Sequence, residues 1–365
     1  MRYVFEGEAR SCRPGPPFMR IGIVNDSVMA REALRRVVTS AEGLQVAWTA
    51  RDGAEGVDMV RADMPDLVLM DLFMPKMDGV DSTRRIMKET PCPILVVTAT
   101  VSGQIDKVYQ AMGFGALDAV DTPVLGACGN CSGGADLLKK IHTIGKLVGK
   151  YQPKCPAWTP PLAPPPGQGL EPLVVIGAST GGPFAVAEVL KGLPRDWSVA
   201  TVIVQHVDAF FVAGLADWLR DHSGRRVQLV ADGHRPAPGD FLLAATGDHL
   251  VMDPDGRLRY SAEPKSACYR PSVDVFFQSV ARNRPGPGAA ALLTGMGRDG
   301  AEGLLALKRR GWRTVAQDEA SSVVWGMPRA AFEIGAAEIV APLDEVADAL
   351  VQGLAAARAG VSVAK

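Results

Sequence analysis

The sequence predicts an α/β protein with two domains, each organised around a parallel sheet. Three observations lead to this fold class. Short apolar runs alternate with stretches of helical periodicity, which is typical of strand–helix–strand units. The 365 residues exceed the usual length of one domain. Residues 151–172 contain eight prolines, which can neither continue a helix nor join a central strand, so we expect a linker there between the domains.

Composition and charge narrow the class of protein. The chain is 47% hydrophobic and 22% charged, with a formal net charge of -1, which indicates neither a nucleic-acid partner nor a membrane surface. No apolar run approaches the roughly 18 residues of a membrane span. We therefore expect a cytoplasmic protein. Six cysteines argue against a disulfide framework, and the lone C-x-x-C of Cys128 and Cys131 predicts a loop pair rather than a metal or redox site.

The N-terminal part divides into a short leader and a first domain. Residues 1–18 lack the apolar core of a signal peptide, and Met19 directly precedes the first apolar run. We expect 1–18 to be a disordered leader or to lie upstream of the true start. In the first domain, residues 19–150, buried-strand patterns alternate with helical ones. Strands are expected at 21–24, 67–70 and 94–97, and helices at 29–38, 79–89 and 101–112.

Polar side chains stand at the ends of these three strands. Asp26 follows the first strand, Asp71 follows the second, and Thr98 follows the third. Because the carboxyl ends of parallel strands meet at one edge of a sheet, we expect these side chains to converge there. Carboxylate oxygens suit Mg²⁺, and a carboxylate beside Mg²⁺ can attack a phosphoryl group to form an acyl phosphate.

The segments DLVLMDLFMPKMDG and ILVVTAT carry this acidic edge and resemble the receiver domain of two-component response regulators, over residues 19 to about 140. The resemblance implies a flavodoxin-like, doubly wound parallel sheet. It also implies that Asp71 is the phosphoacceptor and that Thr98 senses the phosphoryl group. Mg²⁺ would be held by Asp26, Asp71 and the backbone carbonyl of Phe73.

Two residues depart from the receiver pattern. Asn25 stands where a second acid is usual, and Thr122 stands where the segment GALDAVDTP would carry a lysine. Loss of an acid should weaken metal binding. Loss of the lysine removes a cation that would pair with the phosphoryl oxygens. Both departures bear on the rate and lifetime of phosphorylation at Asp71, and the sequence leaves open whether they slow it or abolish it.

The second domain is expected at residues 173–356, with a tail at 357–365. Its alternating patterns predict an α/β domain with a mostly parallel sheet. Residues 226–262 are rich in glycine and proline turns and predict an inserted hairpin region. Strands are expected at 173–176, 199–204 and 289–293, and helices at 183–190, 210–221, 273–281 and 300–310.

The octapeptide IGASTGGP, residues 176–183, allows two interpretations. Its G-x-S-x-G pattern is that of a sharp strand-to-helix turn exposing a nucleophilic serine, here Ser179. The same glycine-rich loop could instead hold a phosphate at a helix N-terminus. A nucleotide site would show G-x-G-x-x-G or a glycine–lysine pair before serine or threonine, and neither is present.

A nucleophilic serine needs a base, and the base needs a carboxylate to orient it. Only His206, which closes the core run TVIVQH, is expected at the edge where Ser179 lies. Asp299 follows a third core strand in ALLTGMGRDG, although by itself it could equally be a helix N-cap. The chain order of the α/β-hydrolases would instead require His249 with an acid such as Asp240, both in the turn-rich insertion.

The second domain resembles the catalytic domain of CheB, the chemotaxis protein-glutamate methylesterases, from about residue 173 to 350. The matching segments are VVIGASTGGP, VIVQHVDAFF, CYRPSVDVFFQSVA, LLTGMGRDGAEGL and AQDEASSVVWGMPRAA. The resemblance implies that Ser179 is the nucleophile, His206 the base and Asp299 its orienting acid. It also implies that Thr180 and Met296 belong to the site, the latter through a backbone amide in the oxyanion hole.

The resemblance further implies the reaction and its control. Such an enzyme hydrolyses γ-glutamyl methyl esters on the cytoplasmic domains of methyl-accepting chemoreceptors, releases methanol, and could deamidate glutamine by the same chemistry. Its catalytic domain needs no cofactor. A histidine kinase of the CheA type would phosphorylate the receiver and loosen its packing over the edge that carries Ser179. The start IGIVND and the segment GALDAVDTP resemble the Wsp branch, which acts in surface sensing and biofilm formation.

Two other function classes stay open at this point. One is a phosphorylation-controlled docking protein whose hydrolase domain is idle, which the Ser179, His206 and Asp299 set disfavours. The other is a nucleotide-binding signalling domain, which the missing lysine disfavours. A DNA-binding regulator is disfavoured because no basic helix-turn-helix pattern follows the linker.

Overall fold

The computed structural model describes residues 19–98, 105–125, 131–148, 171–207, 209–267, 269–284 and 288–363. The chain divides into two compact units, Met1–Gln152 and Pro153–Lys365. The predicted leader 1–18, almost all of the predicted linker 151–172, and Cys128 of the C-x-x-C lie outside the described residues. Within those ranges, no helix is long and apolar enough to cross a bilayer.

The first unit is built on a five-stranded parallel sheet with the order β2-β1-β3-β4-β5, which confirms the doubly wound fold class. The predicted strands are present. The edge strand β2 escaped prediction because only Trp48 and Ala50 in it are buried. The bounds are β1 Met19–Val24, β2 Leu44–Ala50, β3 Leu67–Met70, β4 Ile94–Thr98 and β5 Asp118–Asp121, with a small ribbon of β6 Val124–Leu125 and β7 Cys131–Ser132.

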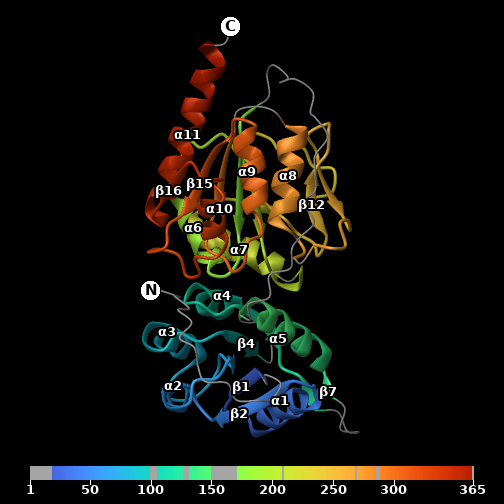
Figure 1. Cartoon of the computed structure of the whole chain (residues 1–365), viewed down its shortest axis with the longest axis vertical. Helices are drawn as coiled ribbons and strands as arrows, with labels where there is room; N and C mark the ends of the chain where they lie inside the picture. The colour runs from blue at the N-terminus through green and yellow to red at the C-terminus, as the bar shows by residue number, and fades with distance from the viewer. Residues whose placement is uncertain are drawn as a thin grey trace. The chain divides into compact units, whose positions relative to one another are not determined.

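Helices cover both faces of this sheet (Figure 1). On one face α1 and α5 bury an apolar core with alternate residues of the strands, and α2, α3 and α4 pack together on the other. Ser27 caps α1 by accepting a hydrogen bond from the Ala30 N–H. The bounds are α1 Val28–Ser40, α2 Gly53–Ala62, α3 Gly79–Glu89, α4 Ile105–Gly113 and α5 Gly134–Val148.

The second unit is built on a seven-stranded parallel sheet with the order β10-β11-β9-β8-β14-β15-β16. Only part of the predicted hairpin region is a hairpin. β12 and β13 pair antiparallel, but β10 and β11 extend the main sheet in parallel, because a short three-residue strand leaves too weak a pattern to read. The bounds are β8 Leu173–Ala178, β9 Ala200–Gln205, β10 Val227–Leu229, β11 Phe241–Leu243, β12 His249–Met252, β13 Leu258–Ser261, β14 Gly288–Leu292, β15 Arg313–Gln317 and β16 Ile339–Ala341.

Two groups of helices enclose this sheet. One group, α8, α9 and α10, shares an apolar core with β8, β9 and β14, and α8 lies beside α9 (Figure 1). The other group, α6, α7 and α11, packs together on the opposite face. The last helix runs to Val363, so most of the expected tail continues α11. The bounds are α6 Gly182–Gly192, α7 Val212–Ser223, α8 Val273–Asn283, α9 Ala301–Arg309, α10 Met327–Glu333 and α11 Leu343–Val363.

Packing beside β14 leaves no room for a side chain at Gly288. A Cβ there would lie 2.6 Å from ring atoms of the buried Trp312. We expect Gly288→Ala to lower the free energy of unfolding of the second unit by about 1–3 kcal/mol, measured by urea denaturation. Gly247→Ala, where a Cβ meets nothing within 4 Å, is the control and should change it by less than about 0.5 kcal/mol. Equal effects of the two changes would contradict this packing.

Candidate active site

Three adjacent strands bring the predicted catalytic residues to one edge of the second sheet. Ser179 directly follows β8, His206 directly follows β9, and Asp299 lies in the loop between β14 and α9. Because β8 pairs with both β9 and β14 in parallel, the three carboxyl ends are neighbours. In the sheet, β8 lies between β9 and β14, so the strand order changes direction at β8. Parallel sheets bind ligands in the crevice at such a point.

Ser179 occupies a sharp turn between β8 and α6. Its N–H donates to the Thr294 carbonyl at 3.0 Å, and its own carbonyl accepts from the Gly182 N–H at 2.8 Å. Gly181 has a left-handed backbone with φ 76°, and Pro183 occupies the first turn of α6. The serine is therefore presented at the N-terminus of α6, where helix N–H groups favour a developing negative charge.

The loop after β14 lies directly against the serine. A Cβ at position 295 would fall 2.7 Å from the Ser179 Cβ and 2.3 Å from the Met327 Sδ, so only glycine allows this approach. Met296 is the next residue. Thr180 is almost fully buried, and its carbonyl accepts from the Thr294 hydroxyl at 2.9 Å. Thr180 thus adjoins Ser179 in the chain, and Met296 adjoins Gly295, the residue that lies against the serine; their part in the site stays a prediction.

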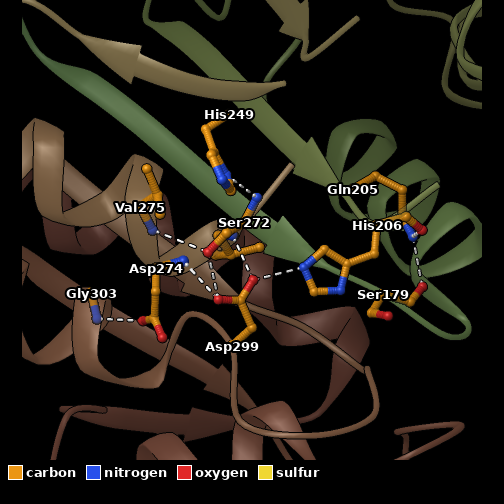
Figure 2. Close-up of polar contacts among 10 residues, drawn as sticks. Ser179, Gln205, His206, His249, Ser272, Asp274, Val275, Asp299 and Gly303 are labelled. Carbon is orange, nitrogen blue, oxygen red and sulfur yellow. Dashed lines mark hydrogen bonds and ion pairs between the residues drawn. The ribbon is translucent and has the colours of Figure 1, made fainter. Parts of the chain in front are cut away.

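The imidazole of His206 lies between Asp299 and Ser179 (Figure 2). Its Nε2 is 2.7 Å from Asp299 Oδ2, and both side chains are at least nine-tenths buried. A carboxylate only accepts hydrogen bonds, so Nε2 carries the proton. Nδ1 is buried and has no hydrogen-bond partner among the described residues. The Nδ1 lone pair of His206 therefore lies next to a serine. This is the arrangement of a general base whose hydrogen bond to the serine hydroxyl shortens when substrate binds.

Four donors hold the Asp299 carboxylate. Besides His206, Oδ1 accepts from the Ser272 hydroxyl at 2.7 Å and the Asp274 N–H at 3.2 Å, and Oδ2 accepts from the Val273 N–H at 2.6 Å. Burial alone would raise the pKa of Asp299, but these hydrogen bonds, led by that from His206, hold it below its usual value. Asp299 is thus an anion that can orient the imidazole and stabilise its protonated form.

Asp299 does not cap the helix that follows it. Gly300 occupies the N-cap of α9, and the Asp299 carboxylate turns to the first N–H groups of α8 instead. The N-cap interpretation of Asp299 is therefore wrong for α9.

The alternative base and acid are not brought together. His249 is fully buried, its Nδ1 accepts from the Ser272 N–H at 3.2 Å, and its Nε2 donates to the Pro264 carbonyl at 3.2 Å. Burial lowers the pKa of His249. Asp240 pairs instead with His234 at 2.9 Å. His249 is thus a neutral structural residue, and the chain order of the α/β-hydrolases does not apply.

Three residues at the site escaped sequence reasoning. The buried Gln205 amide donates to the carbonyls of Ser179 at 2.7 Å and His206 at 3.0 Å, and so ties the two loops together. The Tyr269 ring stacks on the imidazole with centroids 4.3 Å apart and planes 8° apart. Ser272 is the third. Tyr269 and Ser272 lie in the quoted segment CYRPSVDVFFQSVA, but nothing in that segment predicts contact with the imidazole or its acid.

The acidic edge of the first unit has the same construction. Asp26, Asp71 and Thr98 stand at the carboxyl ends of the adjacent strands β1, β3 and β4. Asp71 is nearly buried, whereas Asp26 is exposed. Burial raises the pKa of Asp71 to about 6, and the charge of Asp26 adds to this rise, while the N–H groups of Phe73 and Leu72 oppose it.

The residues at this edge fit a magnesium ion. No described group of three or more acidic, histidine or cysteine side chains could hold a metal, but Mg²⁺ needs only one or two carboxylates with a carbonyl and waters. A divalent cation would relieve the repulsion between Asp26 and Asp71.

The two residues that depart from the receiver pattern make local hydrogen bonds. The Asn25 amide oxygen accepts from the Ser27 N–H at 2.8 Å, so it stabilises the turn before α1. Thr122 donates its N–H to the Thr98 carbonyl at 3.0 Å.

The geometry predicts that Ser179 reacts with a fluorophosphonate probe. We expect His206→Ala to slow this labelling by about 10²–10⁴-fold, because the base that accepts the serine proton is removed. The control is His222→Ala, since His222 contacts the Trp218 carbonyl at 2.9 Å away from the three strand ends. Labelling is followed by mass spectrometry of the modified peptide. A His206→Ala protein that labels as fast as wild type would contradict the assigned base.

Comparisons with known proteins agree with this architecture. Residues 174–350 match the CheB methylesterase family and residues 21–125 match the response regulator receiver domain. A protein-glutamate methylesterase/protein-glutamine glutaminase 4 of Burkholderia thailandensis is 52% identical over 91% of this chain and 97% of the relative. The protein-glutamate methylesterase/protein-glutamine glutaminase 3 of Pseudomonas aeruginosa is 49% identical over 92% of this chain and 99% of the relative.

Among solved structures, the CheB methylesterase catalytic domain of Thermotoga maritima is 32% identical, over 50% of this chain and 99% of that chain, with a TM-score of 0.48. The matches to the Burkholderia and Pseudomonas proteins cover nearly the whole length of each of these two relatives. The chain therefore belongs to the CheB methylesterase family, with a response regulator receiver domain ahead of the methylesterase domain.

Proposed function

We propose that this protein is a protein-glutamate methylesterase that hydrolyses γ-glutamyl methyl esters on the cytoplasmic domains of methyl-accepting chemoreceptors. The observation that carries the proposal is the buried Nδ1 of His206 beside Ser179, which has no hydrogen-bond partner within the described part of the chain, with Nε2 held by an ionised Asp299. The names of the full-length relatives support the same activity. This substrate places the enzyme in the cytoplasm.

The reaction follows from the hydrogen-bond pattern. Ser179 Oγ attacks the ester carbonyl while His206 Nδ1 takes its proton, and Asp299 stabilises the resulting imidazolium. The imidazolium then protonates the departing methoxide, which leaves as methanol. Water, activated by the same histidine, hydrolyses the acyl-enzyme and leaves a free glutamate. A base of this kind contributes about 10²–10⁴-fold to the rate.

The negative oxygen of the tetrahedral intermediate needs donors. The Met296 N–H is proposed for this role, because Gly295 brings that loop against Ser179, and Thr180 supports the same pocket. One such donor contributes about 10²–10³-fold. A glutamine side chain passes through a similar intermediate and releases ammonia, so the site would also deamidate glutamine. These steps use no metal or cofactor in the second unit.

The receiver domain would control this activity through phosphorylation of Asp71 by a histidine kinase of the CheA type. Asp26, Asp71 and the Phe73 carbonyl would hold the Mg²⁺, which neutralises charge around the phosphoryl group when it is bound. Thr98 would contact the phosphoryl oxygens. We further propose that the unphosphorylated receiver restricts access to Ser179. Membership of the Wsp branch, with its biofilm role, stays a prediction from Asn25 and Thr122.

Methanol release from a methylated chemoreceptor fragment tests this function. Wild type should release methanol, and Ser179→Ala should release it at least about 10³-fold more slowly, because the nucleophile is gone. Acetyl phosphate should raise the rate of wild type but not of Asp71→Asn. Methanol release by Ser179→Ala at near the wild-type rate would refute the mechanism. No release by wild type would instead favour the docking protein with an idle hydrolase domain.

The raised pKa of Asp71, about 6, predicts that protons compete with Mg²⁺. Below this pKa the carboxyl is protonated and is lost as a ligand, so affinity should fall about tenfold between pH 7.5 and pH 5. Isothermal titration of the full chain with MgCl₂ at both pH values measures this. Asp71→Asn should bind weakly at both. A wild-type affinity that does not change with pH would contradict Asp71 as a ligand.

A further inference from the structure

We propose that α8 and α9 exchange their N-terminal carboxylates, Asp299 capping α8 and Asp274 capping α9, and that Asp274 is thereby a positioning residue for the acid of the active site. This inference rests on the proposed function for its link to catalysis. The exchange of carboxylates is also tested independently of catalysis, by the pH dependence of the melting temperature. Figure 2 shows both carboxylates and their donors.

One half of the exchange is at the start of α8. Ser272 is its N-cap and accepts from the Val275 N–H at 3.2 Å, while its hydroxyl donates to Asp299. The next two N–H groups, of Val273 and Asp274, also donate to Asp299. The first turn of α8 therefore directs three donors at one carboxylate that comes from the adjoining loop before α9.

The other half is at the start of α9. Its N-cap is Gly300, which offers no side-chain acceptor. Asp274 Oδ1 accepts from the Gly303 N–H at 2.7 Å instead. Gly303 makes this possible, because a Cβ there would lie 2.6 Å from the Phe277 Cβ on α8. The two helix starts are thus close enough for each to receive a carboxylate from the other.

Charge distinguishes the two acids. Burial raises the pKa of Asp274, and the negative charge of Asp299 adds to the rise, whereas the pKa of Asp299 is lowered. At neutral pH the pair then holds one negative charge, on Asp299, between the positive ends of two helices. Asp274 serves as a neutral acceptor, so the amide oxygen of asparagine can replace it at Gly303.

Loss of this acceptor should disturb the catalytic acid. Without Asp274 Oδ1, the N–H of the buried Gly303, in the first turn of α9, loses its hydrogen-bond partner. Asp299 stands immediately before that turn, and its contact with His206 depends on where the turn lies. A displacement of about 1 Å at a catalytic group can lower a rate by about 10²-fold.

The first test measures hydrolysis of p-nitrophenyl acetate by the full chain, with Ser179→Ala as background. We expect Asp274→Ala to lower kcat by about 10–100-fold with little change in KM, and Asp274→Asn to stay within about twofold of wild type. Glu302→Ala removes another acid from the first turn of α9 and should leave kcat unchanged. Ser279, on α8, accepts a hydrogen bond from the Met252 N–H. Ser279→Ala removes this acceptor and should reduce the stability of the second unit but not kcat.

A wild-type kcat in Asp274→Ala, or a loss no greater than in Ser279→Ala at matched stability, would overturn the positioning role. Should wild type release no methanol from the methylated chemoreceptor fragment, the proposed function fails, and the charge of the Asp274 and Asp299 pair is still judged by the next measurement.

The second test follows the melting temperature of the second unit between pH 5 and pH 8. Burial raises the pKa of Asp274 to about 8, so the folded protein keeps this proton over most of the range, while the unfolded chain, with a pKa of about 4, has lost it. The aspartate therefore contributes less stability as the pH rises. Asparagine has no proton to lose, so the melting temperature of Asp274→Asn relative to wild type should increase from pH 5 to pH 8. A constant difference would overturn the shared charge.

Discussion

The hydrogen-bonded carboxylate of Asp299 is the constraint on which the active site depends. An isolated buried anion is costly, and the protein offsets that cost with the His206 imidazole, the Ser272 hydroxyl and two N–H groups at the start of α8. Because Asp299 is ionised and accepts only, His206 must place its proton on Nε2. The lone pair on Nδ1, and with it the basicity that Ser179 requires, follows from this arrangement.

The two units of the chain apply one construction to different chemistry. In each, the proposed nucleophile follows the middle one of three adjacent parallel strands: Asp71 follows β3 between β1 and β4, and Ser179 follows β8 between β9 and β14. The neighbouring strand ends supply the partners of each nucleophile. A parallel sheet gathers such residues because all its strands end at the same edge.

This construction explains how much the sequence could predict. Continuous apolar runs predicted β8, β9 and β14, and the residues that follow them include Ser179, His206 and Asp299, so the strand ends predicted that these three residues would lie at one edge of the sheet. The contacts of Gln205, Tyr269, Ser272 and Asp274 could not, because they depend on how loops far apart in the sequence pack together. The sequence predicts a hairpin region where the parallel strands β10 and β11 lie, because strands of three residues show no periodicity.

Environment, not residue type, divides the roles of the aspartates. Burial, together with the charge of Asp26, raises the pKa of Asp71, and among the described residues two neighbouring N–H groups donate to its carboxylate and oppose this rise. Asp299 accepts from four donors that lower its pKa against the effect of burial, whereas burial and the charge of Asp299 raise the pKa of Asp274. An acid that is proposed to bind a cation and a phosphoryl group benefits from few fixed donors. An acid that is proposed to stay charged while a histidine gains and loses a proton benefits from many, and His206 and the start of α8 provide them.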